Sequence, residues 1–352
     1  MKKVLVAMSG GVDSTVACAL LQQQGYQTAG VTLRMYSENP ASVAQSIGDA
    51  QKQADKLGIP HYVLDARKAF EKKVIAPFIA AYQAGCTPNP CVICNRKIKF
   101  ALLFDLAREK GYDFIASGHY GAIVRDAYSG RYLIRTAAYR SKDQSYVLYN
   151  LTQEQLSRLI LPLSGMTKPQ VRKLAEKLGF AVSDKPDSQD ICFIDGSDYA
   201  GFIRRYSGQQ EIPGDFVDAS GKVLGRHRGV THYTIGQRKG LGIALGAPAF
   251  VTAIDAKRHT ITLSTREADV YTKQAYAHEI NLLAWEKLDY PLRTSAKIRY
   301  AAAPAPCTVW PAGPDRVRVI FDAPVRALTP GQSIVFYRDD LVLGGGVIEK
   351  PV

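Results

Sequence analysis

Three of the six cysteines in this 352-residue sequence lie close together. Cys86, Cys91 and Cys94 fall within "GCTPNPCVICNRKIKF", where two residues separate Cys91 from Cys94. Such a pair can form half of a zinc site, a disulfide, part of an iron–sulfur site or a catalytic thiol pair. The sequence offers no second close pair, which argues against structural zinc. A local disulfide is disfavoured because six cysteines without secretory context indicate a reducing compartment.

A distant cysteine, Cys192, extends the two remaining interpretations. The spacing Cys86-x4-Cys91-x2-Cys94 with Cys192 matches a plant-type [2Fe–2S] ligand set. In the other interpretation, Cys192 is the distant partner in sulfur transfer. Its segment "KPDSQDICFIDG" alternates so that a strand would place Asp190, Cys192 and Ile194 on one side, and a half-buried strand cysteine is the ordinary alternative. The residues alone leave these interpretations open.

A second chemical signal is "AMSGGVDST", which spans Ala7–Thr15 and joins an apolar run to a helical pattern. Two adjacent glycines allow a tight turn that exposes backbone N–H groups, and the helix N-terminus that follows favours an anion. The loop therefore suits a phosphate group. The ordinary alternative is a tight turn with Asp13 or Ser14 as a helix N-cap. The pattern is neither a Walker A loop nor a dinucleotide fingerprint.

The elements that would position these residues follow from the hydrophobic pattern. "KKVLVAM" is a continuous apolar run, which is typical of a strand covered on both faces. Strands and helices then alternate through about Phe193, which predicts an α/β fold with a doubly wound parallel sheet. From about Gly196 the chain becomes rich in turns, and beyond about Ala268 short alternating segments between glycine and proline turns predict a small antiparallel β-barrel. We expect domains at residues 1–196, 197–267 and 268–352.

Composition indicates the class of partner. The formal net charge is +13, and residues 200–259 contain nine Lys and Arg against four Asp and Glu. A local basic excess beside glycines and tyrosines is typical of a surface that binds nucleic acid. No apolar run is long enough to cross a membrane. We expect a cytoplasmic protein that binds a polyanion and no membrane.

The hexapeptide Ser9–Ser14 resembles the pyrophosphate loop of the ATP pyrophosphatase superfamily, whose members use ATP to adenylate an oxygen. The resemblance implies ATP and Mg2+ as cofactors, and it implies no particular metal ligand in the chain. It also implies a set of nucleotide-binding residues at the ends of successive strands: Ala7, Met8, Ser9, Gly10, Gly11, Val12, Asp13, Ser14, Leu33 and Gly118.

Six motifs across the chain resemble those of the bacterial tRNA 2-thiouridylases, in the same order. They are "TPNPxxxCNRxIKF", "SGHY", "KDQSYVL", "DSQDICFI", "YTIGQRKGLGI" and "TPGQ". The resemblance implies an adenine nucleotide alpha-hydrolase-like catalytic domain, a central tRNA-binding domain and a C-terminal barrel. The implied reaction is ATP-dependent 2-thiolation of the wobble uridine, U34, in the tRNAs for Lys, Glu and Gln, with release of AMP and pyrophosphate.

The same resemblance implies roles for individual residues. Cys192 would carry a persulfide received from a donor protein, a cysteine desulfurase or a relay, and Cys94 would close a disulfide with it. Some members carry aspartate at the position of Cys91, and Cys86 matches no family requirement. A cluster on Cys91, Cys94 and Cys192 is the alternative mechanism. The implied tRNA contacts are His119, Lys142, Asp143, Gln144, Arg299, Tyr300 and Gln332.

Two other classes remain to be separated by experiment. Another adenylating enzyme of the superfamily, such as a tRNA lysidine synthase or an amidating synthetase, would need the loop but would not explain Cys94 with Cys192. A non-catalytic tRNA-binding or iron–sulfur protein would release no pyrophosphate when tRNA and ATP are present.

Overall fold

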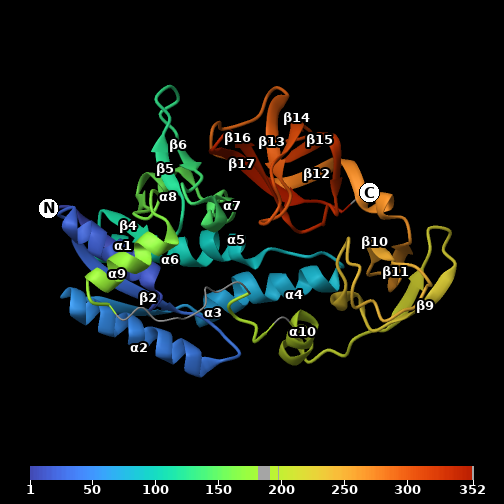
Figure 1. Ribbon diagram of the computed structural model, residues 1–352, viewed down its shortest axis with the longest axis horizontal. Helices are drawn as coiled ribbons and strands as arrows, with labels where there is room; N and C mark the ends of the chain where they lie inside the picture. The colour runs from blue at the N-terminus through green and yellow to red at the C-terminus, as the bar shows by residue number, and fades with distance from the viewer. Residues whose placement is uncertain (181–190, 197, 351–352) are drawn as a thin grey trace.

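Across the described residues, the fold comprises three sheets: a parallel sheet, a four-stranded central sheet and an eight-stranded sheet that includes a barrel (Figure 1). It is seen in a computed structural model that describes residues 1–180, 191–196 and 198–350. Within these residues, no helix is both long and apolar enough to cross a membrane.

The first sheet is parallel and has the strand order β3-β2-β1-β4-β7. Its strands are β1 (Lys3–Ala7), β2 (Gln27–Arg34), β3 (His61–Asp65), β4 (Phe114–Ser117) and β7 (Leu159–Ile160). The strand order reverses at β1, since β2 and β4 lie on either side of it. In such sheets the carboxyl ends at the reversal form the ligand crevice.

Helices cover both faces of this sheet because β1 is apolar on both sides. Val4 and Val6 pack with helices α1 (Val12–Gln23) and α2 (Pro40–Leu57), whereas Leu5 packs with α6 (Ala101–Lys110) on the opposite face. A further helix, α9 (Lys168–Lys177), packs beside α1. The predicted doubly wound α/β fold is confirmed.

Two helical segments each contain a π-turn that the sequence pattern did not predict. The first consists of α3 (Arg67–Phe70), η1 (Glu71–Ile75) and α4 (Ala76–Gln83). The second consists of α5 (Pro90–Cys94), η2 (Asn95–Phe100) and α6. Both η1 and η2 are π-helical, a geometry that is rare and is often found at functional sites. The second carries two of the clustered cysteines.

The central region forms a four-stranded sheet of order β10-β11-β8-β9, in which β11 and β8 are parallel. Its elements are α10 (Tyr199–Ser207), β8 (Gly214–Val217), β9 (Val223–His227), η4 (Val230–His232), β10 (Phe250–Asp255) and β11 (Thr260–Ser264). The segment between η4 and β10 contains many turns, as its glycines predict, and packs Tyr233 and Leu241 onto the sheet.

The C-terminal region is an antiparallel barrel, which confirms that prediction. A short helix, η5 (Glu267–Val270), precedes the barrel strands β12 (Tyr271–Leu282), β13 (Leu292–Lys297), β14 (Ala305–Pro311), β15 (Arg316–Arg326), β16 (Ser333–Arg338) and β17 (Leu341–Ile348). The sheet closes because β12 pairs with both β15 and β17. Closure leaves the barrel without free edges along most of its length.

A hairpin that follows β4 in the chain extends the barrel sheet. Its strands are β5 (Ala122–Arg125) and β6 (Tyr132–Arg135), and β6 pairs with β17 through Ile134 with Val342 and Arg135 with Leu341. Figure 1 shows this hairpin standing beside the barrel. The elements that follow it are η3 (Arg140–Lys142), α7 (Ser145–Leu148) and α8 (Gln153–Ser157).

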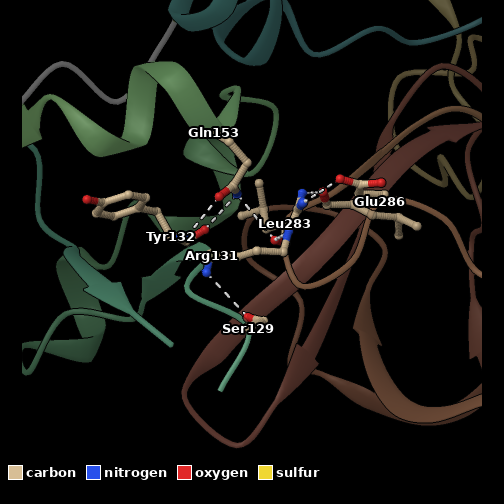
Figure 2. A network of polar contacts seen from close by, with 7 residues as sticks. Ser129, Arg131, Tyr132, Gln153, Leu283 and Glu286 are labelled. Carbon is tan, nitrogen blue, oxygen red and sulfur yellow. Dashed lines mark hydrogen bonds and ion pairs between the residues drawn. The ribbon is translucent and has the colours of Figure 1, made fainter. Parts of the chain in front are cut away.

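Polar contacts fix the hairpin to the barrel (Figure 2). Gln153 exchanges two hydrogen bonds of 2.8 Å with the backbone of Tyr132 and donates a third, of 3.2 Å, to the carbonyl of Leu283. The Nε of Arg131 donates to the same Leu283 carbonyl at 2.8 Å. The barrel is therefore held directly against the region that contains the parallel sheet.

Candidate active site

The glycine loop requires glycine at its first turn. Gly10 has φ +74°, and a Cβ on it would lie 2.5 Å from the backbone carbonyl oxygen of Ser46 in α2. Gly11 is the N-cap of α1 and no side chain caps that helix. The alternative in which Asp13 or Ser14 is the N-cap is therefore wrong. Because no side chain caps the first backbone N–H groups of α1, the turn suits an anionic group.

Hydrogen bonds within the loop keep its shape. The Oγ of Ser14 donates to the Gly11 carbonyl at 3.0 Å and accepts from the backbone N–H of Ser9 at 3.2 Å. The Gln53 amide of α2 donates to the carbonyl of Gly10 at 3.2 Å and receives a hydrogen bond from Thr15. The loop is consequently preorganised by its own residues and by α2.

The end of β4 forms the other wall of the loop. A Cβ on Gly118 would lie 2.9 Å from both Asp13 C and Ser14 N, so only glycine allows this approach. Asp13 is held from two more elements, because Lys168 Nζ lies 2.7 Å from its Oδ2 and Tyr120 donates to its Oδ1 at 2.9 Å. The sequence interpretation did not include Lys168 or Tyr120. A lysine at the start of a helix was the available signal for the first.

The ten predicted nucleotide-binding residues lie at one edge of the parallel sheet. The loop follows β1, Leu33 lies near the end of β2, and Gly118 follows β4. These three strands are adjacent, so their carboxyl ends meet there. The predicted set is spatially compact, and its contact with nucleotide stays a prediction.

The two close cysteines lie one turn apart on α5. Pro90 starts this helix, and Asn89 caps it by accepting from the Cys91 N–H at 3.1 Å. Cys94 is buried, with its Sγ 4.0 Å from Met35 Sδ just beyond β2, whereas Cys91 is exposed. The two cysteines therefore differ in their access to solvent.

Cys192 lies next to this pair. Phe193 and Ile194, which follow it, are buried in the same apolar cluster as Cys94 and Phe78, and Leu33 packs against that cluster. Residues 191–196 form turns rather than a strand. The alternating strand predicted around Cys192 is therefore wrong, because two consecutive side chains, Phe193 and Ile194, are both buried. Asp190 lies outside the described residues.

The three thiols interact with one another. Burial raises the pKa of Cys192 to about 12, and the nearby Cys94 and Cys91 thiols add to the rise. Burial also raises the pKa of Cys91 and of Cys94, while the Lys99 ammonium acts in the opposite direction on all three. Cys91 and Cys192 are both exposed residues, yet desolvation by the nearby protein is still the largest cause of their raised pKa values. The free thiol of Cys192 is therefore mostly protonated at neutral pH.

A short path of contacts leads from Lys99, whose charge acts on the thiols, to the loop. Lys99 Nζ lies 3.5 Å from His119 Nε2, and His119 Nδ1 lies 2.9 Å from the Oγ of Ser117 at the end of β4. Gly118, between them in sequence, is the residue packed against Asp13 and Ser14. The two chemical signals of the sequence thus belong to one region of the molecule.

A pocket of about 400 Å3 opens beside Cys91. Cys91 and Ile191 line one part of it, the central region contributes His232 and Gln237, and the barrel contributes Gln332. All three regions of the chain therefore meet at this pocket, next to the cysteines.

Some of the predicted tRNA contacts lie at the junction between the region of the parallel sheet and the barrel. The Tyr300 hydroxyl donates to the Asp143 carbonyl at 2.9 Å, and Lys297 Nζ lies 5.8 Å from the centroid of the Tyr300 ring. Lys142 is the last residue of η3 and immediately precedes Asp143, and Arg299 is exposed beside Tyr300. These residues come together from two separated segments.

The remaining predicted contacts have partners within the protein. The Asp143 carboxylate accepts from the Ala137 N–H at 2.8 Å and from the Ser145 hydroxyl at 2.7 Å, so it holds its own loop. Gln144 accepts from the Tyr120 N–H at 2.9 Å. Gln332 donates to the Thr87 carbonyl at 2.8 Å, beside the pocket. Contact of any of the seven with RNA stays a prediction.

The cluster alternative does not fit this arrangement. Across residues 1–180, 191–196 and 198–350, no three His, Cys, Asp or Glu side chains are grouped as a metal site requires. No step is therefore assigned to a cluster on Cys91, Cys94 and Cys192. Two carboxylates lie at the loop, Asp13 and Asp49, and that of Asp13 is already paired with Lys168 and Tyr120.

Three domain families match the chain in succession. They are the tRNA methyl transferase HUP domain over residues 2–196, the tRNA methyl transferase PRC-barrel domain over 200–265 and the aminomethyltransferase beta-barrel domain over 272–348. The boundaries expected after residues 196 and 267 fall in the short gaps between these ranges.

Full-length relatives share close to half of their residues with this chain. The tRNA-specific 2-thiouridylase MnmA of Acetivibrio thermocellus is 47% identical over 357 residues, covering 99% of both chains. The protein of the same name from Clostridioides difficile is 46% identical, covering 99% of this chain and 98% of its own. A partial likeness in fold extends to the U34-tRNA thiolase NcsA from Methanococcus maripaludis, with 18% identity, coverage of 59% and 64%, and a TM-score of 0.35. By its sequence identity over the whole length, the chain belongs to the tRNA-specific 2-thiouridylase family.

Proposed function

We propose that the protein is an ATP-dependent tRNA-uridine 2-sulfurtransferase that converts U34 of the tRNAs for Lys, Glu and Gln to 2-thiouridine. The names of its full-length relatives support the reaction class. The observation that carries the proposal is the docking of the Cys192 segment onto Cys94 and Leu33, at the sheet edge that carries the glycine loop. An activated base and a sulfur-bearing thiol can meet there.

In the first step, the C2 oxygen of uridine attacks the α-phosphorus of ATP, which forms an O-adenylated base and releases pyrophosphate. The adenylate turns a poor leaving group into AMP. The N–H groups at the start of α1 receive the phosphate charge, and Lys168 together with Tyr120 fixes Asp13 at the loop. Mg2+ bound with the nucleotide would neutralise the developing charge on pyrophosphate.

In the second step, a persulfide on Cys192 attacks C2 and AMP departs, leaving the base joined to Cys192 through two sulfur atoms. A persulfide is more acidic than a thiol, so it supplies an anionic nucleophile where the free thiol, with its pKa of about 12, does not. Cys192 is exposed, which suits delivery of sulfur by a donor protein such as a cysteine desulfurase or a relay.

In the third step, the Cys94 thiolate attacks the Cys192 sulfur, the bond to the outer sulfur breaks, and 2-thiouridine leaves. The product on the enzyme is a Cys94–Cys192 disulfide, which an external dithiol must reduce before the next turnover. If the outer sulfur is released first as hydrosulfide, the same disulfide forms and hydrosulfide attacks the adenylated base. Both routes require the two cysteines, and both suit a reducing cytoplasm.

The pocket beside Cys91 is the proposed place for the extruded base. Its volume of about 400 Å3 exceeds what a pyrimidine base needs, and a wobble uridine can be unstacked from its loop. Lys142, Arg299 and Tyr300 lie at the junction of the nucleotide fold with the barrel, where phosphate contacts would hold the anticodon stem. The net charge of +13 suits this partner.

The test is mass spectrometry of the wobble nucleoside after unmodified tRNA is incubated with the protein, ATP and a persulfide donor. We expect 2-thiouridine at position 34, dependent on ATP and absent with Cys94→Ser or Cys192→Ser, which should both still bind ATP. An active Cys192→Ser variant would contradict the persulfide route. Pyrophosphate release without any sulfur in the tRNA would indicate a different adenylating enzyme.

A further inference from the structure

The π-turn that follows Cys94 determines which way the Lys99 side chain points. Lys99 lies in η2 (Asn95–Phe100), five residues after Cys94. In an α-helix of about 3.6 residues per turn, residues five apart differ by roughly 140° around the axis. The i to i+5 spacing of a π-turn brings them close to the same face. An uninterrupted α-helix would therefore direct Lys99 away from Cys94.

The Lys99 ammonium also contacts His119. Its Nζ lies 3.5 Å from His119 Nε2. A lysine ammonium has only donors, so Nε2 must accept, and the proton of the neutral ring is then on Nδ1, which donates to Ser117 Oγ at 2.9 Å. Burial, with Lys99 as the second cause, holds the pKa of His119 well below its usual value. Burial thus keeps His119 neutral, and Lys99 adds to that effect and fixes the tautomer of the ring.

The neighbouring cations do not share this position. Arg96 is turned to the Asn150 amide, to which its Nη1 donates at 2.6 Å, and Lys97 is exposed. Among the residues that the structure describes, Lys99 is the cation whose charge acts on Cys91, Cys94 and Cys192 together. The other titratable group near this set is the Tyr300 phenol, which interacts with Cys91 from the barrel side.

We propose that Lys99 is a positioning residue that links the two halves of the active site: its ammonium stabilises anionic sulfur on Cys94 and Cys192 and orients the His119 ring, with Nδ1–H directed to Ser117. Its contribution to turnover rests on the proposed sulfur transfer, in which both attacking groups are sulfur anions. Its effect on the thiols does not depend on that reaction. The two can therefore be measured separately.

The experiment compares Lys99→Met and Lys99→Gln with Lys99→Arg, which keeps the charge, and with Lys97→Met, which removes an exposed lysine from the same π-turn. Alkylation of Cys94 and Cys192 by iodoacetamide is followed by peptide mass spectrometry between pH 6 and 10, without ATP or tRNA. We expect the neutral Lys99 variants to react about 3- to 10-fold more slowly at pH 7.5, with the profile displaced to higher pH. Lys99→Arg and Lys97→Met should match the parent protein.

The second readout is the pH profile of single-turnover thiolation, which should move in the same direction while the KM for ATP is unchanged. Unaltered alkylation profiles in both neutral variants, with a native circular dichroism spectrum, would overturn the proposal. If Lys99→Met shifts alkylation but the parent protein makes no 2-thiouridine, the proposed function fails and the role of Lys99 toward the thiols stands.

Discussion

Glu38 accepts a hydrogen bond from the backbone N–H of Asp195, three residues after Cys192, at 3.1 Å from its Oε2. Arg205 of α10 donates to both oxygens of the same carboxylate, at 2.9 and 3.1 Å, and the Glu38 N–H donates to the Phe193 carbonyl at 3.3 Å. Glu38 follows β2, so this contact ties the Cys192 segment to the sheet edge that carries Leu33.

Replacing Glu38 should release the Cys192 segment. We expect Glu38→Ala to lower single-turnover thiolation about tenfold, because the sulfur must be placed within reach of the base, while ATP binding persists. The matched control is Asp65→Ala, which removes an exposed carboxylate paired with Arg67 at the end of β3. Equal rates in Glu38→Ala and the parent protein would show that the anchor is not needed.

The same contact predicts an acid-sensitive segment. Arg205 holds the pKa of Glu38 below its usual value, so the stabilisation is present above the unfolded-state pKa of about 4.3 and is lost as pH falls through the lower folded-state pKa. Amide exchange of residues 191–196, corrected for intrinsic rates, should therefore stay protected at pH 5–7 and lose protection below about pH 4. Glu38→Gln should lack this transition. A transition of the same size in that variant would assign it to another group.

Gly118→Ala tests the closeness of β4 to the loop. The added Cβ would lie 2.9 Å from Asp13 C and Ser14 N, so the loop must move by several tenths of an ångström. We expect the KM for ATP to rise about tenfold or more, since the N–H groups would no longer converge on the phosphates. Gly48→Ala in α2, where nothing lies within 4 Å of the new Cβ, should leave the KM unchanged and slightly stabilise the helix. A normal KM for ATP in Gly118→Ala would mean that this loop does not bind the nucleotide.

The raised pKa of Cys192 predicts how the unloaded enzyme titrates. Below a pKa of about 12 the thiolate fraction grows about tenfold per pH unit, so alkylation of Cys192 should rise steadily from pH 7 to 10 without a plateau. Cys94 should react more slowly than Cys192 throughout because it is buried. A plateau near pH 8 would mean that the thiol is activated before it receives sulfur.

Cys91 should not be required for turnover. It is exposed in the pocket and has no role in the proposed sulfur transfer, so Cys91→Asp and Cys91→Ser should each retain activity within about tenfold of the parent protein. Cys94→Ser and Cys192→Ser provide the inactive references. Complete loss in both Cys91 variants, with ATP binding intact, would reinstate a three-cysteine mechanism.

The sequence predicted best where a local pattern determines the structure. The apolar run of β1 and the adjacent Gly10 and Gly11 identify a buried strand and a tight glycine turn, because burial and glycine conformation are local properties. The alternating short strands after Ala268 likewise predicted the barrel. The resemblance to a family supplied the pairing of Cys94 with Cys192.

The errors and omissions arise from long-range contacts. The turn at Phe193 and Ile194 replaces the predicted strand because both side chains pack into a cluster made by α3, η1 and α4. The β5–β6 hairpin was missed because it joins the barrel through only two residue pairs, Ile134 with Val342 and Arg135 with Leu341, some 200 positions apart. Lys99 was one of three nearby cations in the sequence, and the π-turn that selects it has no sequence signature.

The most direct test of the account is one turnover of enzyme loaded on Cys192 with isotopically labelled outer sulfur, mixed with ATP and unmodified tRNA without reductant. The account predicts that labelled 2-thiouridine at position 34 and the Cys94–Cys192 disulfide appear in equal amounts, up to one of each per loaded enzyme. Labelled product in the absence of that disulfide, or from Cys192→Ser, would contradict it.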